Sequence, residues 1–209
     1  MSTYKPLAET LRPGKLSEFV GQQHLLGSDK PIGKALKDKQ LHSMIFWGPS
    51  GVGKTTLARI ICQMGAHFEQ MSAVLDGVKE LRNIIKHAEL YKQNDRSTVL
   101  FVDEIHRFNK AQQDGFLPHI ESGLLTLIGA TTENPSFEIN SALLSRARVY
   151  ILEKLSDDEL EVIALRAMKK QDIQLESDSS LSLIIENSDG DARRLINIIE
   201  QLANSSGRL

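Results

Sequence analysis

The chain has 209 residues, of which 41% are hydrophobic and 25% are charged, a composition typical of globular proteins and not of disordered or fibrous ones. Its formal net charge of −2 does not indicate general affinity for nucleic acid, so any contact with phosphate groups would need local clusters of basic residues. No apolar run approaches the roughly 20 residues of a membrane helix, and the N-terminus lacks the features of a signal peptide. We therefore expect a cytoplasmic protein without a membrane partner.

A single cysteine, Cys62, excludes an internal disulfide and a cysteine-based metal site, and its apolar neighbours predict a small residue of the core. Three groups of basic residues are candidates for contact with nucleic acid, although solvated helix faces have the same composition. These groups are Lys34, Lys37 and Lys39; Arg82 and Lys86; and Arg107 and Lys110.

The first element with a clear pattern is a strand at residues 43–47, followed by a glycine-rich loop and a helix predicted at 55–64. The loop reads Gly48-Pro49-Ser50-Gly51-Val52-Gly53-Lys54-Thr55, which fits the pattern G-x-x-x-x-G-K-[ST]. In such a loop, backbone N–H groups and the positive end of the helix dipole face an anion. We therefore expect a phosphate-binding loop in which Lys54 reaches the β- and γ-phosphates of a nucleotide and Thr55 ligates Mg²⁺.

A second strand is predicted at 66–71 and a helix at 77–93, with Asp76 as its N-cap. Apolar residues recur along this helix at positions that share one face, which predicts a buried stripe. The stripe consists of Val78, Leu81, Ile84, Ile85 and Ala88.

The third strand, predicted at 98–102, ends in Asp103 and Glu104, the arrangement called Walker B. Because ligands bind at the carboxyl ends of strands in open α/β sheets, we expect Asp103 to hold the Mg²⁺ shell and Glu104 to orient and polarise an attacking water. An Asp-Glu pair after a strand can also cap the next helix, but the loop upstream favours the functional interpretation. The acid at Glu104 favours hydrolysis over phosphoryl transfer by a kinase of this class, which we keep as an alternative.

Asp103 to His106 also fit the D-E-x-H box of helicases, but 209 residues leave no room for the second motor domain of that class. We expect His106 to be packed or hydrogen-bonded and not to act as a base. A helix is predicted at 110–120 and a strand at 124–129. The segment 129–135 that follows could sense the γ-phosphate, although an ordinary turn would have the same Thr, Asn and Pro content.

A short helix at 141–145 and a strand at 149–152 complete an alternation that predicts an α/β fold with a parallel five-stranded sheet flanked by helices. After residue 155 only helices are predicted: one that opens with a capping box at Ser156 and Glu159 and runs to about 170, one from 178 or 179, and one after Gly190. We expect a nucleotide-binding core at 1–155 and a small all-helical domain at 156–209, in which residues 203–209 have the composition of a linker.

Motifs spread over nearly the whole chain resemble those of the AAA+ ATPases of the clamp-loader and branch-migration-motor clade. They include Leu11-Arg12-Pro13, Gly21-Gln22-Gln23-His24, the phosphate-binding loop, Asp103-Glu104 and Gly190-Asp191-Ala192-Arg193. Two stretches, 106–110 and 129–137, are most similar to the replication-associated recombination protein A family (RarA/MgsA), whose eukaryotic relative is the Werner-helicase-interacting ATPase. Ser50 is a departure, because relatives usually carry proline there.

The resemblance implies roles for single residues. Thr132 matches the sensor-1 residue, Arg146 matches an arginine finger that completes the site of a neighbouring subunit, and Arg193 matches the sensor-2 arginine of a helical lid. An adenine pocket is implied at Leu7, Arg12, Val20 and Gly21. ATP and Mg²⁺ would be held by Gly48, Pro49, Ser50, Gly51, Val52, Gly53, Lys54, Thr55, Thr56, Asp103 and Arg193.

The resemblance further implies an oligomeric, DNA-dependent ATPase that acts in recombination and repair at stalled or damaged replication forks. The implied partners are forked or single-strand-containing DNA, further copies of the chain, and replication proteins such as single-strand-binding protein or polymerase and clamp components, at the bacterial nucleoid. An ATP-switched adaptor that recruits replication proteins without remodelling DNA is the alternative. Because members of the family continue into a C-terminal region that drives oligomerisation, the resemblance also implies that this chain is an ATPase fragment.

Overall fold

The computed structural model describes residues 4–38, 40–63, 66–173 and 178–206, and contacts divide the chain into two compact units. Residues 23–48 and 54–152 form the first, called here the sheet unit. Residues up to 22, 49–53 and from 153 onward form the second, called here the helical unit. Most of the phosphate-binding loop thus belongs to the helical unit. The predicted boundary at residue 155 differs from this grouping and stays a prediction.

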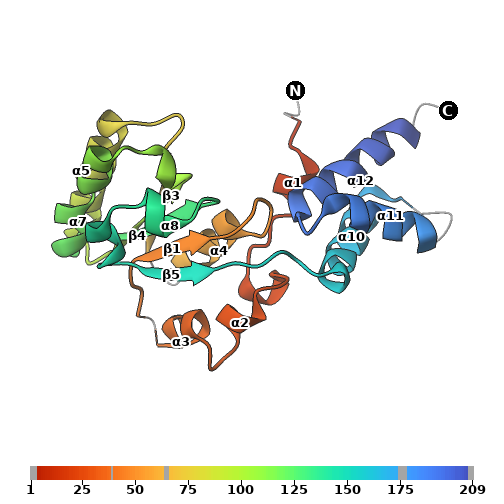
Figure 1. Ribbon diagram of the computed structural model, residues 1–209, viewed down its shortest axis with the longest axis horizontal. Coiled ribbons are helices and arrows are strands. Elements are labelled where there is room, and N and C mark those ends of the chain that lie inside the picture. The colour runs from red at the N-terminus through yellow and green to blue at the C-terminus, as the bar shows by residue number, and fades with distance from the viewer. Residues whose placement is uncertain (1–3, 39, 64–65, 174–177, 207–209) are drawn as a thin grey trace. The chain divides into compact units, whose positions relative to one another are not determined.

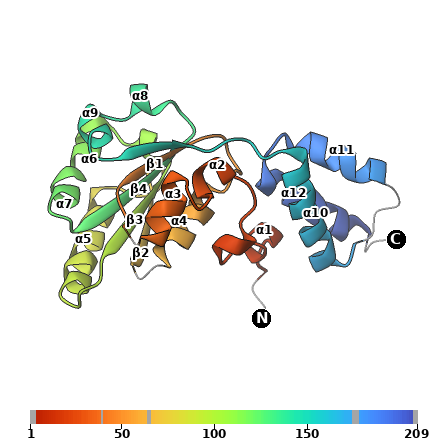
Figure 2. The same cartoon turned by 90° about the horizontal axis from the view of Figure 1, so that it is seen from below.

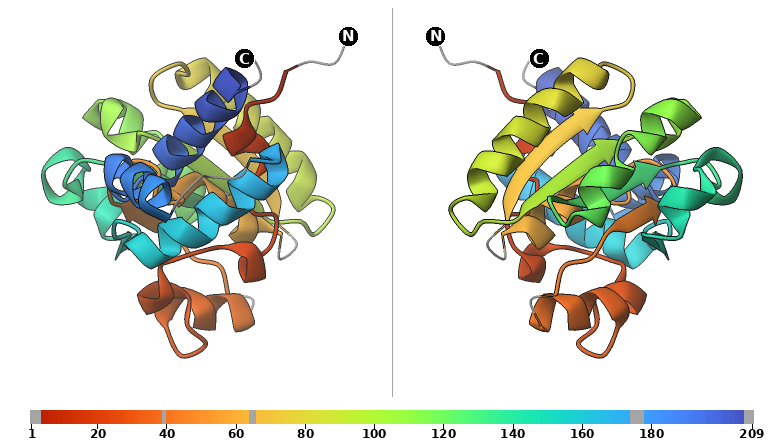
Figure 3. Two further views of the ribbon diagram at one scale, coloured as in Figure 1. Left: turned by 90° about the vertical axis from the view of Figure 1, so that its right-hand side faces the viewer. Right: turned by 90° about the vertical axis from the view of Figure 1, so that its left-hand side faces the viewer.

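The sheet unit is built on five parallel strands in the order β2-β3-β4-β1-β5 (Figure 1). Their bounds are β1 Met44–Trp47, β2 His67–Ser72, β3 Thr98–Asp103, β4 Leu125–Thr131 and β5 Arg148–Ile151. Figure 3 shows β2 and β3 side by side in this sheet. The predicted α/β fold with a five-stranded parallel sheet is confirmed. Strands β1, β3 and β4 are almost fully buried, which explains why their sequences are continuous apolar runs.

Helices cover both faces of the sheet. On one face, α5 (Val78–Lys92) packs Leu81, Ile84 and Ala88 into a core that includes Leu100 of β3. On the other, Arg59 of α4 (Lys54–Cys62) lies over the ring of Phe68, which stacks on Phe101 with ring centroids 6.3 Å apart. Leu100 and Phe101 enter different layers because successive strand residues point to opposite faces.

Cys62, at the end of α4, is buried as predicted for a core residue. Its burial raises the pKa of the thiol to about 12, because the thiolate would lose its hydration in the apolar interior. The thiol is therefore a packing group and not a nucleophile.

Three details of the predicted elements were wrong. Asp76 does not cap α5: Gly77 holds the N-cap position, and the Asp76 carboxylate accepts a hydrogen bond from Ser72 N at 2.7 Å within the preceding turn. Val78, in the first turn of α5, is 50% exposed and lies outside the buried stripe. The helix predicted at 110–120 is two helices, because Pro118 has no N–H for the carbonyl four residues earlier and so begins a new helix.

The other helices of the sheet unit are short. They are α2 Gln23–Leu26, α3 Pro31–Lys37, the 3₁₀ turn η2 Ile105–Arg107, α6 Lys110–Asp114, α7 Leu117–Glu121, α8 Pro135–Glu138 and α9 Ser141–Leu144. Figure 2 shows α9 beside α6, which it contacts. Helices α2 and α3 precede β1, and the others connect β3 to β4 or β4 to β5.

The helical unit contains α1 Leu7–Thr10, the 3₁₀ turn η1 Leu16–Glu18, α10 Asp157–Gln171, α11 Asp178–Ser188 and α12 Ala192–Ser206. Its core joins Leu7 to apolar residues of α10, α11 and α12. The capping box of Ser156 and Glu159 is confirmed. The prediction of a linker from residue 203 was wrong as far as Ser206, because α12 continues to that residue; residues 207–209 lie outside the described part of the chain. None of the described helices is long and apolar enough to cross a membrane.

Candidate functional site

The candidate site lies at the carboxyl edge of the sheet. Because β1, β3 and β4 are parallel, the residues that follow them meet at one edge. Trp47 pairs with Thr131, and Gly48 N donates to Thr131 O at 3.2 Å, so the start of the phosphate-binding loop joins the end of β4. β4 lies between β1 and β3, and β3 ends in Asp103. Within the sheet unit, this strand order brings Gly48, the end of β3 and the end of β4 to one edge.

Within the sheet unit, Lys54 and Thr55 begin helix α4. Lys54 is only 8% exposed, and its Nζ donates to Gly48 O at 2.7 Å across the base of the loop. A buried ammonium group next to backbone N–H groups at a helix N-terminus provides the positive charge that a phosphate requires. Thr55 is half-buried one residue further on.

Within the helical unit, two glycines of the loop have left-handed backbone conformations, with φ of +68° at Gly51 and +99° at Gly53. A Cβ at Gly51 would overlap the carboxylate of Asp191, and one at Gly53 would lie 2.7 Å from the ring of Phe19. Both positions therefore need glycine for its backbone freedom and for close packing. Neither Phe19 nor Asp191 was predicted as a site residue. Their contacts could not be inferred from spacing.

Asp191 connects the loop to helix α12 inside the helical unit. Its Oδ2 accepts from Ser50 Oγ at 2.7 Å, and its Oδ1 accepts from Arg194 N at 2.9 Å in the first turn of α12. Ala192 N also donates to Gly51 O at 3.3 Å. Arg193 lies exposed in the same first turn. Arg193, the predicted sensor-2 residue, therefore directly follows Asp191 and Ala192, which bind the loop. Its role as a sensor stays a prediction.

In the sheet unit, Glu104 follows Asp103 in the left-handed conformation, with φ of 53° and ψ of 45°. A residue other than glycine in this region costs on the order of 1–3 kcal/mol and is common at functional sites. The Glu104 carboxylate lies 3.4 Å from His106 Nε2, and His106 Nδ1 lies 2.9 Å from the hydroxyl of Thr131. The prediction that His106 is a hydrogen-bonded residue is confirmed.

Thr131 is the threonine at the end of β4 whose hydroxyl contacts His106, just after the Walker B acids. Thr131 is fully buried, whereas Thr132, the predicted sensor-1 residue, is exposed after the end of β4. Glu133 N donates to Thr131 Oγ1 at 3.0 Å, which holds the hydroxyl in place. The assignment of sensor 1 to Thr132 stays a prediction, and Thr131 is a site residue that the sequence analysis missed. Its place at the end of the apolar run of β4 is the only signal in the sequence that could have identified it.

Arg146 follows α9 on the surface of the sheet unit, with its side chain 38% exposed. Its guanidinium pairs with the carboxylate of Glu121 and donates to Ala142 O and Ser145 Oγ, both at 2.9 Å. The group is thus folded against its own subunit by exposed contacts. Exposed ion pairs are weak, so the side chain can leave these partners for a stronger acceptor.

The four residues of the predicted adenine pocket all belong to the helical unit. Leu7 is buried in the helical core, and the guanidinium of Arg12 donates to Glu9 Oε2. Val20 is partly exposed, and Gly21, with φ of +88°, packs against Leu155. Because the Leu7 and Arg12 side chains have these partners, contact with a base would use mainly backbone groups. The pocket stays a prediction.

Magnesium fits the donor set that the sequence predicts. Mg²⁺ prefers hard oxygen ligands and keeps several waters, so one hydroxyl, one carboxylate and the phosphates of a nucleotide suffice. Thr55 and Asp103 offer this set. Among the described residues, no group of three or more His, Cys, Asp or Glu lies close enough together to hold a metal ion.

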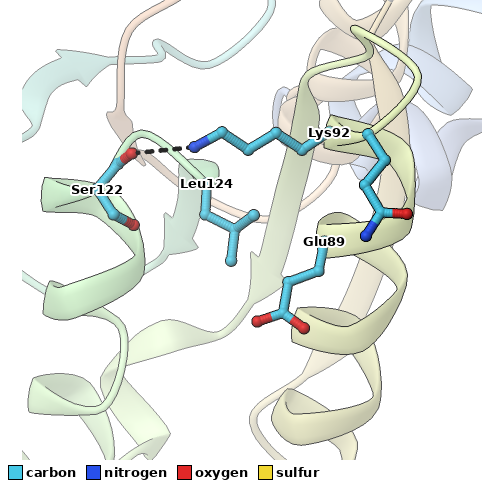
Figure 4. Close-up of a pocket in the computed structure, with 5 residues that line it drawn as sticks. Glu89, Lys92, Ser122 and Leu124 are labelled. Atoms are coloured by element: carbon cyan, nitrogen blue, oxygen red, sulfur yellow. Dashed lines mark hydrogen bonds between the residues drawn. The ribbon is translucent and has the colours of Figure 1, made fainter.

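The basic groups lie on exposed helix faces. Lys34 and Lys37 are exposed on α3, Arg82 and Lys86 on α5, and Lys110 of α6 donates to Glu138 O at 3.1 Å; Lys39 lies outside the described residues. A shallow pocket between the C-terminal end of α5 and the start of β4 is lined by Glu89, Lys92, Gln93, Ser122 and Leu124 (Figure 4). It lies at the amino end of β4, away from the carboxyl edge that carries the candidate site.

Comparisons with known proteins identify related chains and a similar fold. Replication-associated recombination protein A of Escherichia coli (strain K12) is 52% identical over 97% of this chain and 47% of its own length. ATPase WRNIP1 of Dictyostelium discoideum is 43% identical over 95% of this chain and 23% of its own length. A solved structure of the Thermotoga maritima RuvB Holliday junction branch migration motor matches with a TM-score of 0.78 and 32% identity, over 93% of this chain and 65% of that one. The chain therefore spans about half, or less, of these curated relatives.

A family model also matches residues 44–155, described as the ATPase family associated with various cellular activities (AAA). The matched segment is more than half of the chain, and it contains the phosphate-binding loop, Asp103, Glu104 and Arg146. The chain belongs to the AAA family of ATPases.

Proposed function

We propose that the chain binds ATP with Mg²⁺ at residues 48–55 and hydrolyses it with Glu104. The observation that carries this proposal is the position of Glu104, which follows Asp103 at the same sheet edge as Lys54 and Thr55. An acid next to the Mg²⁺-binding aspartate suits water as the nucleophile, whereas a kinase needs a second substrate there.

Each residue has a part in the proposed reaction. Lys54 neutralises the β- and γ-phosphates, and Thr55 and Asp103 hold Mg²⁺, which when bound supplies positive charge to the phosphate oxygens. Glu104 accepts a proton as the water oxygen forms a bond to the γ-phosphorus. The bond from the γ-phosphorus to the bridging oxygen breaks, and ADP and inorganic phosphate leave. Thr132, Arg146 and Arg193 are proposed to respond to the γ-phosphate.

We further propose that the full-length protein works as an oligomer on DNA. The names of the relatives support this: one concerns replication-associated recombination, and another is a Holliday junction branch migration motor. Forked or single-strand-containing DNA would contact the exposed basic groups on α3, α5 and near α6. Replication proteins, including single-strand-binding protein and polymerase or clamp components, are the proposed protein partners.

The test compares Glu104→Gln with wild type in the full-length protein. We expect the variant to bind ATP normally, because no phosphate contact is lost, and to release phosphate at least about 100-fold more slowly, because the general base is absent. Remodelling of forked DNA should stop with hydrolysis. Glu89→Gln, an acid at the opposite edge of the sheet, is the control and should behave as wild type.

Two outcomes would contradict parts of the proposal. Undiminished phosphate release by Glu104→Gln would show that Glu104 is not the base. Full recruitment of partners by Glu104→Gln despite lost hydrolysis would favour the ATP-switched adaptor, and undiminished remodelling of DNA without hydrolysis would contradict the motor.

A further inference from the structure

We propose that His106 is a positioning residue that holds Glu104 through a hydrogen-bonded connection to Thr131. This inference rests on the proposed role of Glu104 in hydrolysis. The three side chains come from different places in the sheet unit: Glu104 follows β3, His106 lies in η2, and Thr131 ends β4.

The proposed role uses the tautomer of His106 in which Nε2 carries the proton. A carboxylate only accepts hydrogen bonds, so His106 Nε2 must carry hydrogen to attract Glu104 Oε2 at 3.4 Å. In that tautomer Nδ1 is an acceptor, and the Thr131 hydroxyl, 2.9 Å away, would donate to it. Glu133 N–H donates to the same hydroxyl at 3.0 Å. A continuous series of contacts therefore runs from Glu133 N–H through Thr131 and His106 to the Glu104 carboxylate.

The Thr131 hydroxyl has a second acceptor, the backbone oxygen of Glu133, at 3.2 Å. If the hydroxyl turns to that oxygen, Nδ1 of His106 has to carry the proton to keep its bond to Thr131. Nε2 then presents a lone pair to the Glu104 carboxylate, and the attraction becomes repulsion. Rotation of one buried hydroxyl thus decides whether Glu104 is held.

Burial restricts His106 to this role. Its side chain is only 8% exposed, and both ring nitrogens face protein partners. The ring has no position from which to take a proton from the attacking water. The 3.4 Å contact is longer than a strong hydrogen bond, so Glu104, with 32% of its side chain exposed, keeps acceptor capacity for a water.

Backbone contacts also help to place the His106 and Thr131 side chains. Arg107 N donates to Glu104 O at 2.8 Å, which closes η2 and places His106 on the same side as the Glu104 side chain. The left-handed backbone of Glu104 is what permits this turn directly after the strand. Thr131 is in turn aligned by the pairing of β4 with β1.

The experiment uses three substitutions that separate the two contacts of the His106 ring. His106→Phe removes both, His106→Gln retains a donor near the position of Nε2, and His106→Asn retains an acceptor near the position of Nδ1. We expect His106→Phe to lower kcat for phosphate release by about tenfold to a hundredfold, the scale set by a misplaced catalytic group. Binding of a non-hydrolysable ATP analogue and the KM for ATP should stay unchanged.

Rescue distinguishes positioning from packing. We expect His106→Gln to recover most of the lost kcat and His106→Asn to recover little. Thr131→Val should lower kcat as His106→Phe does, and the double variant should be no slower than the slower single variant, because both substitutions break the same series of contacts. His87→Gln, at an exposed histidine of α5, is the control and should match wild type.

Other results would overturn the inference. Equal kcat losses for His106→Gln and His106→Asn, with thermal midpoints lowered in parallel, would assign His106 to packing alone. Wild-type kcat in all three His106 variants, with Glu104→Gln inactive, would refute the inference and leave the proposed function intact. An active Glu104→Gln would contradict both.

Discussion

Single residues show how burial changes chemistry in this protein. Cys62 is the only cysteine, and its buried thiol has a pKa raised to about 12, so it contributes packing and no reactivity. Lys54 is also buried, but its ammonium group donates a hydrogen bond to Gly48 O, which offsets part of the cost of burying the charge. Residue type and local pattern identified both side chains in the sequence. The burial predicted for Cys62 is confirmed, and the phosphate contact of Lys54 stays a prediction.

His42 predicts a pH dependence of stability. Burial lowers its pKa below the ordinary 6.5, with Arg148 adding repulsion, and Nε2 of the ring lies 2.8 Å from the Tyr150 hydroxyl. The unfolded chain therefore binds a proton more readily than the folded protein, and stability is lost as pH falls below about 6.5. We expect His42→Gln to lose less stability than wild type between neutral pH and pH 5, measured by urea unfolding.

The comparison concerns the slope of stability against pH, so a uniform loss caused by the substitution does not affect it. His87→Gln on an exposed face should keep the wild-type slope. An unchanged slope in His42→Gln would show that His42 does not carry this effect.

At the scale of elements, segments with a clear apolar pattern were predicted well, whatever their length. The five strands and α5 lie within a few residues of their predicted positions. Helices α1 and α2 have only four residues each, one turn, which is too short for a helical period to appear in the sequence. The helix predicted at 110–120 was divided by Pro118, a local signal that the periodicity obscured.

Replacing a glycine of the phosphate-binding loop should weaken ATP binding more than replacing a glycine elsewhere. We expect Gly51→Ala to lower ATP affinity by at least about tenfold, because a Cβ overlaps Asp191 and the positive φ costs on the order of 1–3 kcal/mol for alanine. Gly14→Ala is the control, since its Cβ would lie 3.8 Å from the nearest atom. Titration of a fluorescent ATP analogue measures both. Wild-type affinity in Gly51→Ala would mean that the loop relaxes without consequence for binding.

At the scale of the whole molecule, we propose that the ATP site needs residues from two subunits. Arg146 is exposed and held by Glu121 and the end of α9, which are weak partners. If it serves a neighbouring subunit, as we propose, each subunit contributes Glu104 to its own site and Arg146 to the next. Activity then depends on assembly of the full-length protein.

Mixing two inactive variants tests this division of labour. We expect Arg146→Ala alone to lower kcat by about 10³-fold or more and to retain ATP binding, as for removal of an arginine finger. Mixed with Glu104→Gln, it should regain part of the wild-type rate, because some interfaces then combine an intact Glu104 with an intact Arg146. Phosphate release from the mixture measures this recovery.

Arg148→Ala, at an exposed arginine nearby, should retain wild-type activity and serves as the control. A mixture that stays as inactive as its components would place the action of Arg146 within its own subunit or in folding.

The sequence by itself determined the parallel sheet, the phosphate-binding loop and the Walker B acids, because each depends on residue types within a short segment. Only the tertiary structure decided which side chains meet at that edge. His106 and Thr131 are 25 residues apart, and Ser50 and Asp191 are 141 apart. The first contact exists because β4 lies beside β3, and the second because residues 49–53 pack with the start of α12. Such pairs follow from strand order and packing, and neither leaves a periodic pattern in the sequence.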